Sequence, residues 1–473
     1  MVFSSSLFLI YFLPLFLLVY FIIPYKVRNY FALLASLIFY AWGAPKFIFI
    51  VLGSVALDFY LVARIPGSKP RQRKLLAAIT IGQNIAMLAW FKYANFFADN
   101  LNLLLEELGA GRFSWSYIAL PIGISFFTFQ KITYVVDVYR GVHTPLKKLS
   151  DYALYILMFP QLIAGPIVRF VEIADQLEDR RANETAENRI SGFFRFSVGL
   201  ARKVLIANPL GAVADQVFSV PGLEFGTATA WLGILAYAFQ IYFDFAGYSD
   251  MAIGLGKVMG FRFPENFNFP YISRSITEFW RRWHITLGRF MRDYLYIPLG
   301  GNRVSPGRTY FNLWVVFLLS GLWHGADWHF VAWGAFHGLF LILDRWFLLK
   351  ILNRAGSLTA IVFTFVISLI GWVFFRAESN AQAIEYLSRM FSYHPESDFV
   401  TLDLRFYSIL AVAALFSFAG VIPAVAEFGA KVYSGNSSGL KIFIRLGLAF
   451  ILFTLSLAGV ISSGFNPFIY FRF

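Results

Sequence analysis

The chain has 473 residues, of which 58% are hydrophobic and only 14% are charged. Ordinary globular proteins carry roughly 45–50% apolar and about 25% charged residues. Aromatic residues make up 19% of the chain, and a water-soluble protein of this size would not hide so much apolar surface. The composition therefore indicates an integral membrane protein and excludes a disordered chain.

The chain carries 40 basic and 27 acidic residues, a net charge of +13, and no cysteine. The lack of cysteine excludes disulfides, zinc–thiolate sites, iron–sulfur sites and thiol nucleophiles. Membrane proteins keep an excess of lysine and arginine in their cytoplasmic loops. We therefore interpret the positive charge as a mark of membrane topology and do not expect a nucleic-acid partner.

A helix that crosses a bilayer needs about 20 apolar residues. We count roughly 11 to 13 such spans, which together account for most of the chain. The runs lie near residues 6–24, 29–43, 48–63, 75–92, 115–137, 150–168, 190–208, 228–247, 309–322, 329–349, 358–375, 405–424 and 440–461. The predicted fold is all-α and polytopic, with a single integral-membrane domain over residues 1–473.

Loop charges predict the orientation of the first five spans. Residues 64–74 (RIPGSKPRQRK) are strongly basic, so we place this loop in the cytoplasm. The loop with Lys26 and Arg28 and the basic segment 139–149 fall on the same side. The acidic stretch 98–111 falls on the opposite side, and the N-terminus is then outside.

Residues 262–303 differ from the simple spans, because they are rich in arginine and interrupted by proline. An arginine at the bilayer centre costs about 2.5–3.5 kcal/mol on insertion scales. From Thr277 to Tyr296 the apolar residues recur at helical spacing, which predicts an amphipathic helix in the membrane interface. Ser275 or Thr277 would cap it, and His284 would lie inside it.

Residues 320–338 (SGLWHGADWHFVAWGAFHG) hold three histidines in an apolar context. Histidine is rare in membrane segments and usually faces the bundle interior, and the glycines favour close helix packing. Asp327 follows His324 by three residues, so a helical turn would let its carboxylate orient the imidazole. His329 and His337 read as core residues bonded to backbone carbonyls. No HxxxH or HExxH spacing occurs, so no metal site is predicted.

Two classes of function stay open on this chemistry. A transporter would use carboxylates near the membrane midplane, and the candidates are Asp58, Asp137, Asp244 and Asp250. A membrane enzyme would use an acid–base group in a cavity, and histidine, with a pKa of about 6.5, suits that task near neutral pH. The concentration of histidine favours the enzyme.

Six features of the chain carry a family resemblance. They are MVFSS at the N-terminus, LPIGISFFTFQ (120–130) with YVVDVYRG (134–141), FPQLIAGPIVR (159–169), YFDFAGYSDMAIGLGKVMGF (242–261), FWRRWHITLGRFMRDYLYIPLGGNR (279–303) and SGLWHGADWHFVAWGAFHG (320–338). In this order they resemble the membrane-bound O-acyltransferase superfamily, and within it the bacterial alginate O-acetyltransferase branch. The resemblance covers nearly the whole chain.

The resemblance implies a many-helix fold around a central funnel, with short interfacial helices shaping a cytoplasmic concavity. It implies that His324 of the WHG motif is catalytic and that His284 of the RWH motif supports it from a neighbouring helix. The spacing of the two residues in the sequence does not show that they meet.

The aromatic C-terminal segment 466–473 (NPFIYFRF) reads by itself as an interfacial anchor. It is also similar to a C-terminal motif of small peptides that accompany related acyltransferases, in which a tyrosine hydroxyl carries the acyl group. The resemblance therefore implies a built-in acyl carrier at Tyr470.

The implied reaction is acetyl transfer from cytosolic acetyl-CoA, across a bacterial inner membrane, to an exported polysaccharide such as alginate, with no bound cofactor. His324 would take the proton of the acceptor hydroxyl, and His284 would orient it or stabilise the oxyanion. The guanidinium groups of Arg282, Arg289 and Arg292 would bind CoA phosphates or lipid headgroups.

The branch also implies a periplasmic partner of the SGNH type, besides the membrane lipids around the protein. Related branches transfer D-alanine to teichoic acid or acetylate peptidoglycan, and these reactions stay open beside alginate acetylation.

Overall fold

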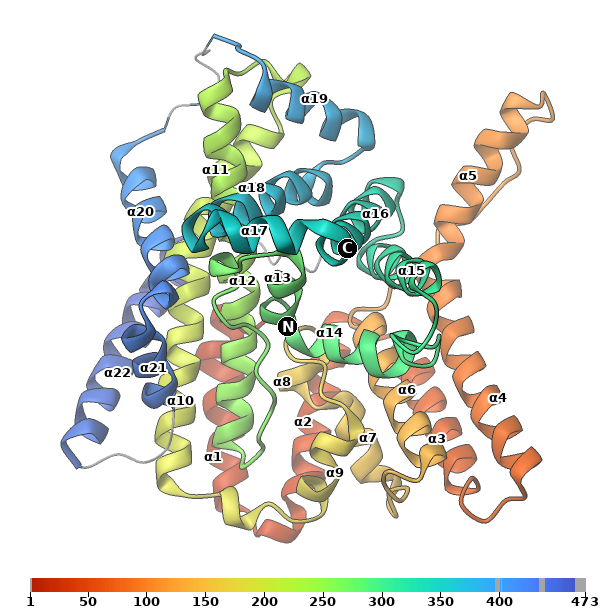
Figure 1. Cartoon of the computed structure of the whole chain (residues 1–473). Helices are drawn as coiled ribbons and strands as arrows, with labels where there is room; N and C mark the ends of the chain where they lie inside the picture. The colour runs from red at the N-terminus through yellow and green to blue at the C-terminus, as the bar shows by residue number, and fades with distance from the viewer. Residues whose placement is uncertain (1, 396–399, 401, 434–438, 464–473) are drawn as a thin grey trace. The chain divides into compact units, whose positions relative to one another are not determined.

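The computed structural model describes residues 2–395, 400, 402–433 and 439–463. These residues form α-helices joined by loops, turns and short 3-10 or π-helical segments, and no β-strand occurs among them (Figure 1). The predicted all-α class is therefore confirmed. The chain divides into two compact units, one of residues 7–182 with 261–263, and one of residues 3–6, 183–260 and the residues from 264 onwards.

The first unit is built from helices that follow one another along the chain. The π-helical segment Leu7–Phe12 leads into α1, and the π-helical segment Ala89–Tyr93 joins α4 to α5. The helices are α1 (Leu13–Ile22), α2 (Arg28–Gly43), α3 (Ile48–Ala63), α4 (Pro70–Leu88), α5 (Ala94–Glu107), α6 (Ile124–Arg140), α7 (Leu149–Leu157), α8 (Phe159–Leu162) and α9 (Phe170–Glu178).

Loops that were predicted to share one side of the membrane do lie together in this unit. The guanidinium of Arg73, at the start of α4, donates to the carbonyl of Tyr139, near the end of α6. Figure 1 shows the α3–α4 connection and the far end of α5 at opposite ends of the continuous α4–α5 helix. The relative sides of residues 64–74, 98–111 and 139–149 are therefore as predicted, and the assignment of one side to the cytoplasm stays a prediction.

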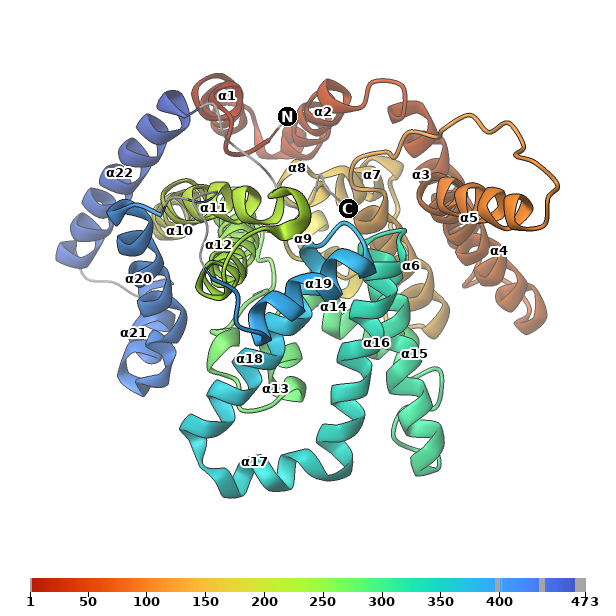
Figure 2. The ribbon, with the colours of Figure 1, turned by 90° about the horizontal axis from the view of Figure 1, so that it is seen from above.

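The second unit is centred on the long helix α12. Its helices are α10 (Ala186–Ala201), α11 (Asn208–Phe218), α12 (Thr227–Val258), α13 (Ile276–Arg282), α14 (Ile285–Phe290), α15 (Pro306–His324), α16 (Trp328–Leu343), α17 (Leu349–Ala355), α18 (Ser357–Arg376), α19 (Asn380–Phe391), α20 (Leu404–Phe418), α21 (Pro423–Tyr433) and α22 (Gly439–Ser462). Figure 2 shows α16, α17 and α18 following one another in an open U.

Two glycine pairs hold α10 and α12 at close range. A Cβ atom on Gly192 would lie 2.6 Å from the carbonyl oxygen of Gly254, and one on Gly199 would lie 2.5 Å from that of Gly247. No larger residue fits at that separation. Small residues that let two backbones approach closely are how helices associate in membranes, where apolar burial supplies little driving force. These glycines let α10 cover one side of α12, which is buried along nearly all of its length.

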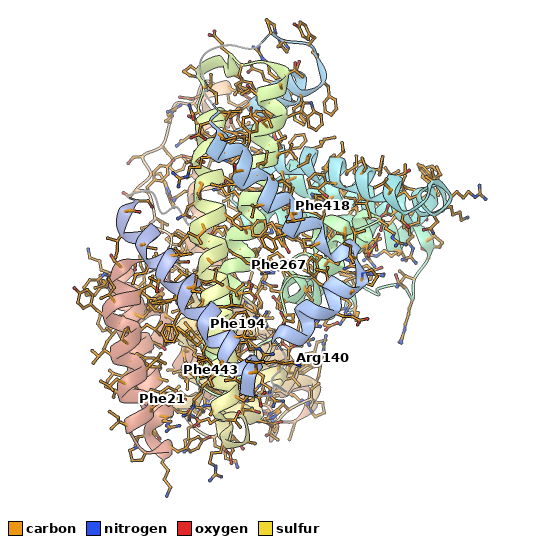
Figure 3. The ribbon with its side chains drawn as sticks, turned by 90° about the vertical axis from the view of Figure 1, so that its left-hand side faces the viewer. Phe21, Arg140, Phe194, Phe267, Phe418 and Phe443 are labelled. Carbon is orange, nitrogen blue, oxygen red and sulfur yellow. The ribbon has the colours of Figure 1, made fainter. Side chains whose placement is uncertain are left out.

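The second unit also includes the C-terminal helices. Figure 3 shows α22 crossing α10, with Phe443 and Phe194 labelled on the two helices. Phe193 of α10 contacts Phe450 of α22, with ring centroids 5.5 Å apart and the ring planes tilted by 60°. Phe418 at the end of α20 meets Phe365 of α18 edge-on at 5.2 Å. Aromatic contacts of this kind attach the C-terminal helices to the core.

Four helical stretches among the described residues are long and apolar enough to cross a membrane, namely Pro70–Glu107, Ser357–Arg376, Leu404–Val421 and Gly439–Ser462. Leu7–Ile22 and Ile48–Ala63 are shorter apolar helices. The chain therefore has the helices of a multi-pass membrane protein.

Two predicted spans take a different form. The run 150–168 breaks into α7 and α8, because Pro160 lies in the first turn of α8 and the chain turns at Met158. The run 115–137 becomes helical only at Ile124, after Gly123 with a φ of 78°. Proline and a left-handed glycine each interrupt the hydrogen-bond ladder of a helix.

Candidate active site

The histidine-rich segment forms a hairpin of two helices. α15 ends at His324, and α16 begins at Trp328. A Cβ on Gly321 would collide with the carbonyl oxygen of Phe330, and the Cα of Gly334 lies 3.2 Å from the same point. As predicted, small residues let the two helices approach closely. The turn between them places His324 at the end of its helix, where its ring is held by the residues around it.

The ring of His324 lies in a box of aromatic side chains. Its centroid is 4.8 Å from that of Trp323, 5.0 Å from that of Trp333 and 5.2 Å from that of Phe375, and each pair is close to edge-on. The side chain keeps 6% of its surface exposed, compared with 1% for His284. An apolar box excludes bulk water and so strengthens any charge interaction made inside it.

The RWH segment is broken where a continuous helix was predicted. α13 ends at Arg282, and α14 starts after His284, whose φ of 44° lies in the left-handed region. Of the two predicted caps, Ser275 and Thr277, the structure confirms Ser275, since its hydroxyl accepts from the backbone N–H of Glu278 at 3.1 Å. The expectation that His284 lies inside a helix is wrong. A non-glycine residue with positive φ is uncommon and strained, and such strain is concentrated at functional positions.

One amide fixes the tautomer of His284. Oδ1 of Asn266 accepts from the backbone N–H of Thr286 at 3.3 Å and from the Thr286 hydroxyl at 2.9 Å. Because a backbone N–H only donates, the facing atom of Asn266 is its oxygen. Nδ1 of His284, 3.1 Å from that oxygen, must therefore carry the proton, and Nε2 carries the lone pair.

Nε2 of His284 is buried and has no hydrogen-bond partner in the described part of the chain. Burial lowers the pKa of His284 to about 3, so the ring is neutral near pH 7. A neutral ring whose Nε2 is unprotonated accepts a hydrogen bond there and does not donate one. This geometry favours positioning over the alternative prediction that His284 stabilises an oxyanion.

Trp323 connects the two predicted histidines. Its ring centroid lies 6.2 Å from that of His284 and 4.8 Å from that of His324. The fold therefore brings together two histidines that are 40 positions apart in the sequence, with one indole ring in contact with both. His284 also meets Phe245 of α12 edge-on at 4.7 Å, so the long central helix supports the same cluster.

The other two histidines of the segment differ from each other. Nδ1 of His329 donates to the carbonyl of Phe374 at 3.0 Å, which makes it the carbonyl-bonded core residue that was expected. His337 is buried between Trp280 and Trp333, at 5.0 and 5.1 Å between ring centroids. Neither of its ring nitrogens has a hydrogen-bond partner among the described residues.

Asp327 does not orient His324, because the turn that links them is not helical. Asp327 caps α16 instead, and its carboxylate accepts from the backbone N–H of His329 at 3.3 Å. The side chain of His329 is its other neighbour, with Nε2 3.9 Å from Oδ1. The prediction of an orienting role for Asp327 is therefore corrected to a capping role.

The arginines proposed for donor binding have local acidic neighbours. Nε of Arg282 donates to Glu278 at 2.8 Å, and Nε of Arg292 donates to Asp293 at 2.6 Å. Arg289 lies in α14 between them. Their role toward a donor stays a prediction. The predicted carrier Tyr470 lies outside the described residues.

The carboxylates that would serve a transporter all have structural partners. Asp58 lies 3.1 Å from Nζ of Lys131, and Asp244 lies 3.1 Å from Nζ of Lys203. Asp250 accepts from Arg195 at 2.8 Å, and Asp137 accepts from the backbone N–H of Val171 at 3.4 Å. Buried charges need such partners, so none of the four requires a transport role. Within the described ranges, no three His, Asp or Glu residues gather as metal ligands.

The sequence profile of the membrane-bound O-acyltransferase family matches residues 143–377, a range that holds both His284 and His324. The protein is also 40% identical to the probable alginate O-acetylase AlgI of Pseudomonas putida over 492 aligned residues, which cover 100% of both chains. The chain belongs to the membrane-bound O-acyltransferase family. It is therefore a multi-pass membrane O-acyltransferase, and this membership favours the enzyme over the transporter.

Two further relatives of this acyltransferase carry related names. It is 46% identical to the probable alginate O-acetylase AlgI of Pseudomonas aeruginosa over 397 residues, 83% of this chain and 75% of the relative. It is 38% identical to the peptidoglycan O-acetyltransferase of Helicobacter pylori over 425 residues, 82% of this chain and 80% of the relative.

Asn266 was missed by the reasoning from sequence. A signal was present, since an uncharged polar residue in the segment ENFNFP precedes the RWH motif by fewer than twenty positions. Asparagine in such a stretch is also a common turn residue, and only the three-dimensional contacts distinguish the two roles.

Proposed function

We propose that this acyltransferase transfers acetyl groups from a cytosolic donor, acetyl-CoA, to an exported polysaccharide such as alginate, in the inner membrane of a bacterium. The full-length similarity to alginate O-acetylases supports the acetyl group and the acceptor. The observation that carries the proposal is the contact of both His284 and His324 with Trp323 inside one buried aromatic cluster.

His324 is the general base in this proposal. The acceptor hydroxyl attacks the thioester carbonyl, an oxygen–carbon bond forms and the carbon–sulfur bond breaks. The hydroxyl proton passes to His324 and then to the departing thiolate, which leaves as the free thiol. Proton transfer by a positioned side chain typically contributes about 10²–10⁴-fold to a rate. The exposed fractions support His324 as the base in preference to His284, because His324 keeps 6% of its surface accessible and His284 only 1%.

His284 is a positioning residue in this proposal. It packs on Trp323, and Trp323 packs on His324. The imidazole that Asn266 holds therefore helps to fix the position of Trp323 beside the proposed base. Aromatic contacts of this kind restrict the rotamers of the rings that they join. The oxyanion role is set aside, since Nε2 of His284 has no proton to donate.

The acetyl group would pass through a carrier and a partner. Tyr470 in the C-terminal segment would accept the acetyl group as an ester, and an SGNH-type protein in the periplasm would move it to the polymer. A phenol has a pKa of about 10, so it needs a base such as His324 to attack a thioester near neutral pH.

The test is acetyl transfer by the purified full-length protein in detergent, supplied with radiolabelled acetyl-CoA. The wild type should release CoA and retain label, His324→Ala should do neither, and Tyr470→Phe should retain no label. Normal CoA release by a correctly folded His324→Ala protein would overturn the general-base role. CoA release with no label on the wild-type protein would rule out the acyl carrier at Tyr470 and leave the acyltransferase proposal in place.

Peptidoglycan is the second candidate acceptor, because the similarity to a peptidoglycan O-acetyltransferase also covers most of both chains. D-Alanyl transfer to teichoic acid is the remaining alternative. Acetylation of purified alginate but not of peptidoglycan fragments, with the periplasmic partner present, would decide for alginate.

A further inference from the structure

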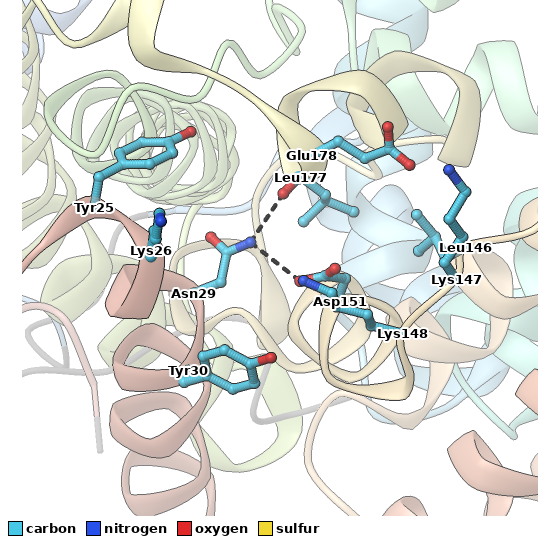
Figure 4. A pocket seen from close by; sticks show the side chains of 10 residues that line it. All are labelled: Tyr25, Lys26, Asn29, Tyr30, Leu146, Lys147, Lys148, Asp151, Leu177 and Glu178. Carbon is cyan, nitrogen blue, oxygen red and sulfur yellow. Dashed lines mark hydrogen bonds between the residues drawn. The ribbon is translucent and has the colours of Figure 1, made fainter.

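The first unit contains a polar pocket that the acyl-transfer chemistry does not use. Its volume is about 520 Å³, which is within the range of roughly 300–1,000 Å³ typical of small-ligand sites. Figure 4 shows the side chains that line it, and they come from the α1–α2 connection, the first turn of α2, the loop before α7 with the start of that helix, and the end of α9. Every one of them belongs to the first unit, whereas His284 and His324 belong to the second.

A buried arginine holds the inner wall of this pocket. The guanidinium of Arg180, only 2% exposed, donates to Oδ1 of Asn29 at 2.7 Å and to the hydroxyl of Tyr20 at 2.8 Å. Nδ2 of Asn29 then donates to Asp151 at 3.1 Å and to the carbonyl of Leu177 at 2.9 Å (Figure 4). The wall is therefore preorganised without a ligand, and ordering it adds no cost to binding.

Three lysines line the pocket, Lys26, Lys147 and Lys148. None of them forms an ion pair within the part of the chain that the structure describes. Two carboxylates also line it, those of Asp151 and Glu178. The lining therefore carries three cationic groups and two anionic ones, a net charge of +1, and the buried guanidinium of Arg180 lies behind Asn29, so the pocket attracts an anion.

The setting of the pocket indicates the kind of anion. Lys26 lies in the short 3-10 segment Tyr25–Val27, soon after the apolar helix α1 ends at Ile22, so the pocket lies where an apolar segment ends and polar surroundings begin. Tyr25 and Tyr30 also line it, and tyrosine is enriched at this depth of a membrane. The loops that supply the lysines are the basic loops expected on the cytoplasmic side, where basic pockets between helices bind phospholipid headgroups.

We propose that this pocket binds a phosphate ester, supplied in the membrane by the headgroup of an anionic phospholipid. The lysine ammonium groups would contact the phosphate oxygens as point charges, and the Tyr30 hydroxyl is placed to donate to the same group. The carboxylate of Glu178 repels an anionic ligand, so removing the charge of Glu178 should strengthen binding.

Native mass spectrometry of the detergent-solubilised protein tests the proposal, with phosphatidylglycerol, cardiolipin and phosphatidylcholine as probes. The triple variant Lys26→Gln/Lys147→Gln/Lys148→Gln should bind the two anionic lipids about 100-fold more weakly, at about 1 kcal/mol per lysine near the surface. Glu178→Gln should bind them more tightly. Phosphatidylcholine adducts should be unchanged in every variant.

A matched control removes the same charge elsewhere. Lys69, Arg71 and Lys74 are exposed, lie at the N-terminal end of α4 in the same unit and do not line the pocket. Their triple glutamine variant should keep the anionic lipid adducts. Equal loss of adducts in both triple variants would mean a general charge effect and would overturn the proposal, as would a wild type without anionic lipid adducts.

A second experiment measures the binding of 3′,5′-ADP, a soluble phosphate ester, and so distinguishes this source of phosphate from a lipid headgroup. Lysine-dependent binding of 3′,5′-ADP without lipid adducts would overturn the lipid source. Absence of both would overturn the phosphate site altogether. Because no outcome depends on acetyl transfer, the result is independent of the proposed function.

Discussion

Oδ1 of Asn266 lies 3.1 Å from Nδ1 of His284 and accepts a hydrogen bond from the N–H of that nitrogen. The same oxygen is shared with the backbone and hydroxyl of Thr286. One side chain thus fixes the tautomer of a histidine that the chain holds in a strained backbone conformation.

Asn266→Asp tests this relationship. The carboxylate keeps the acceptor oxygen but adds a negative charge beside the ring, which stabilises the imidazolium and raises the pKa of His284. We expect the acid limb of the pH–rate profile to move, with a smaller loss of activity than in Asn266→Leu. The Leu variant leaves three buried donors unsatisfied, at about 1–3 kcal/mol each. An unchanged pH profile in a folded Asn266→Asp protein would contradict the positioning role.

His324→Gln should lower acetyl transfer by about 10²–10⁴-fold, because glutamine keeps the polarity of the site without a titratable base. His329→Gln is the matched control from the same segment. His329 bonds the Phe374 carbonyl, and glutamine is able to donate to the same oxygen, so activity should stay within a few fold. Initial rates of CoA release measure both variants, and a similar loss in the two would argue against a special role for His324.

The stability of the enzyme should fall as the medium becomes acidic, in part because of His284. The unfolded side chain has a pKa of about 6.5, and burial lowers the pKa to about 3 in the folded protein. Between those values the unfolded chain binds a proton that the folded chain does not. His284 alone therefore lowers the free energy of unfolding by about 1.4 kcal/mol for each pH unit between 6.5 and about 3.

Thermal unfolding in detergent at about pH 7 and about pH 5 measures this effect. His284→Gln, which cannot titrate, should lose less stability than the wild type between the two conditions. The same pH dependence in both proteins would show that His284 is not a buried neutral ring.

Gly199→Val should disrupt the α10–α12 contact, because a Cβ there would lie 2.5 Å from the Gly247 carbonyl oxygen. Overpacking of this kind typically costs about 1–3 kcal/mol. Gly53→Ala, with no atom within 4 Å of the added Cβ, is the control and should be tolerated. The yield of monodisperse protein after solubilisation reports the outcome, and equal yields would show that the two helices can separate without cost.

Asp58→Leu should destabilise the first unit by about 3–5 kcal/mol, since it leaves Lys131 buried without its counter-charge. Both side chains are fully buried, with Nζ of Lys131 3.1 Å from Oδ2 of Asp58. The double variant Asp58→Leu/Lys131→Met should recover much of that loss, because it removes both charges. Thermal unfolding compares the stabilities of the two proteins. A double variant no more stable than the single one would mean that Asp58 and Lys131 contribute more than the neutralisation of each other's charge.

Several features could be predicted from the sequence because they depend on local chemistry. The apolar runs predicted a polytopic all-α protein, the loop charges predicted which ends lie together, and Ser275 was one of two residues predicted as a cap. Each follows from neighbouring residues, whose helical spacing, charge and capping groups act over a few positions. The motifs also indicated the family, and with it His284 and His324.

The tertiary structure decided how those histidines are held. Nothing local shows that Asn266 holds His284, that Trp323 contacts both rings, or that Asp327 caps α16 instead of orienting His324. The break at His284 was also missed, because an apolar stripe at helical spacing continues through it. Contacts between residues far apart in sequence depend on how helices pack, and packing is set by the shapes of many side chains at once.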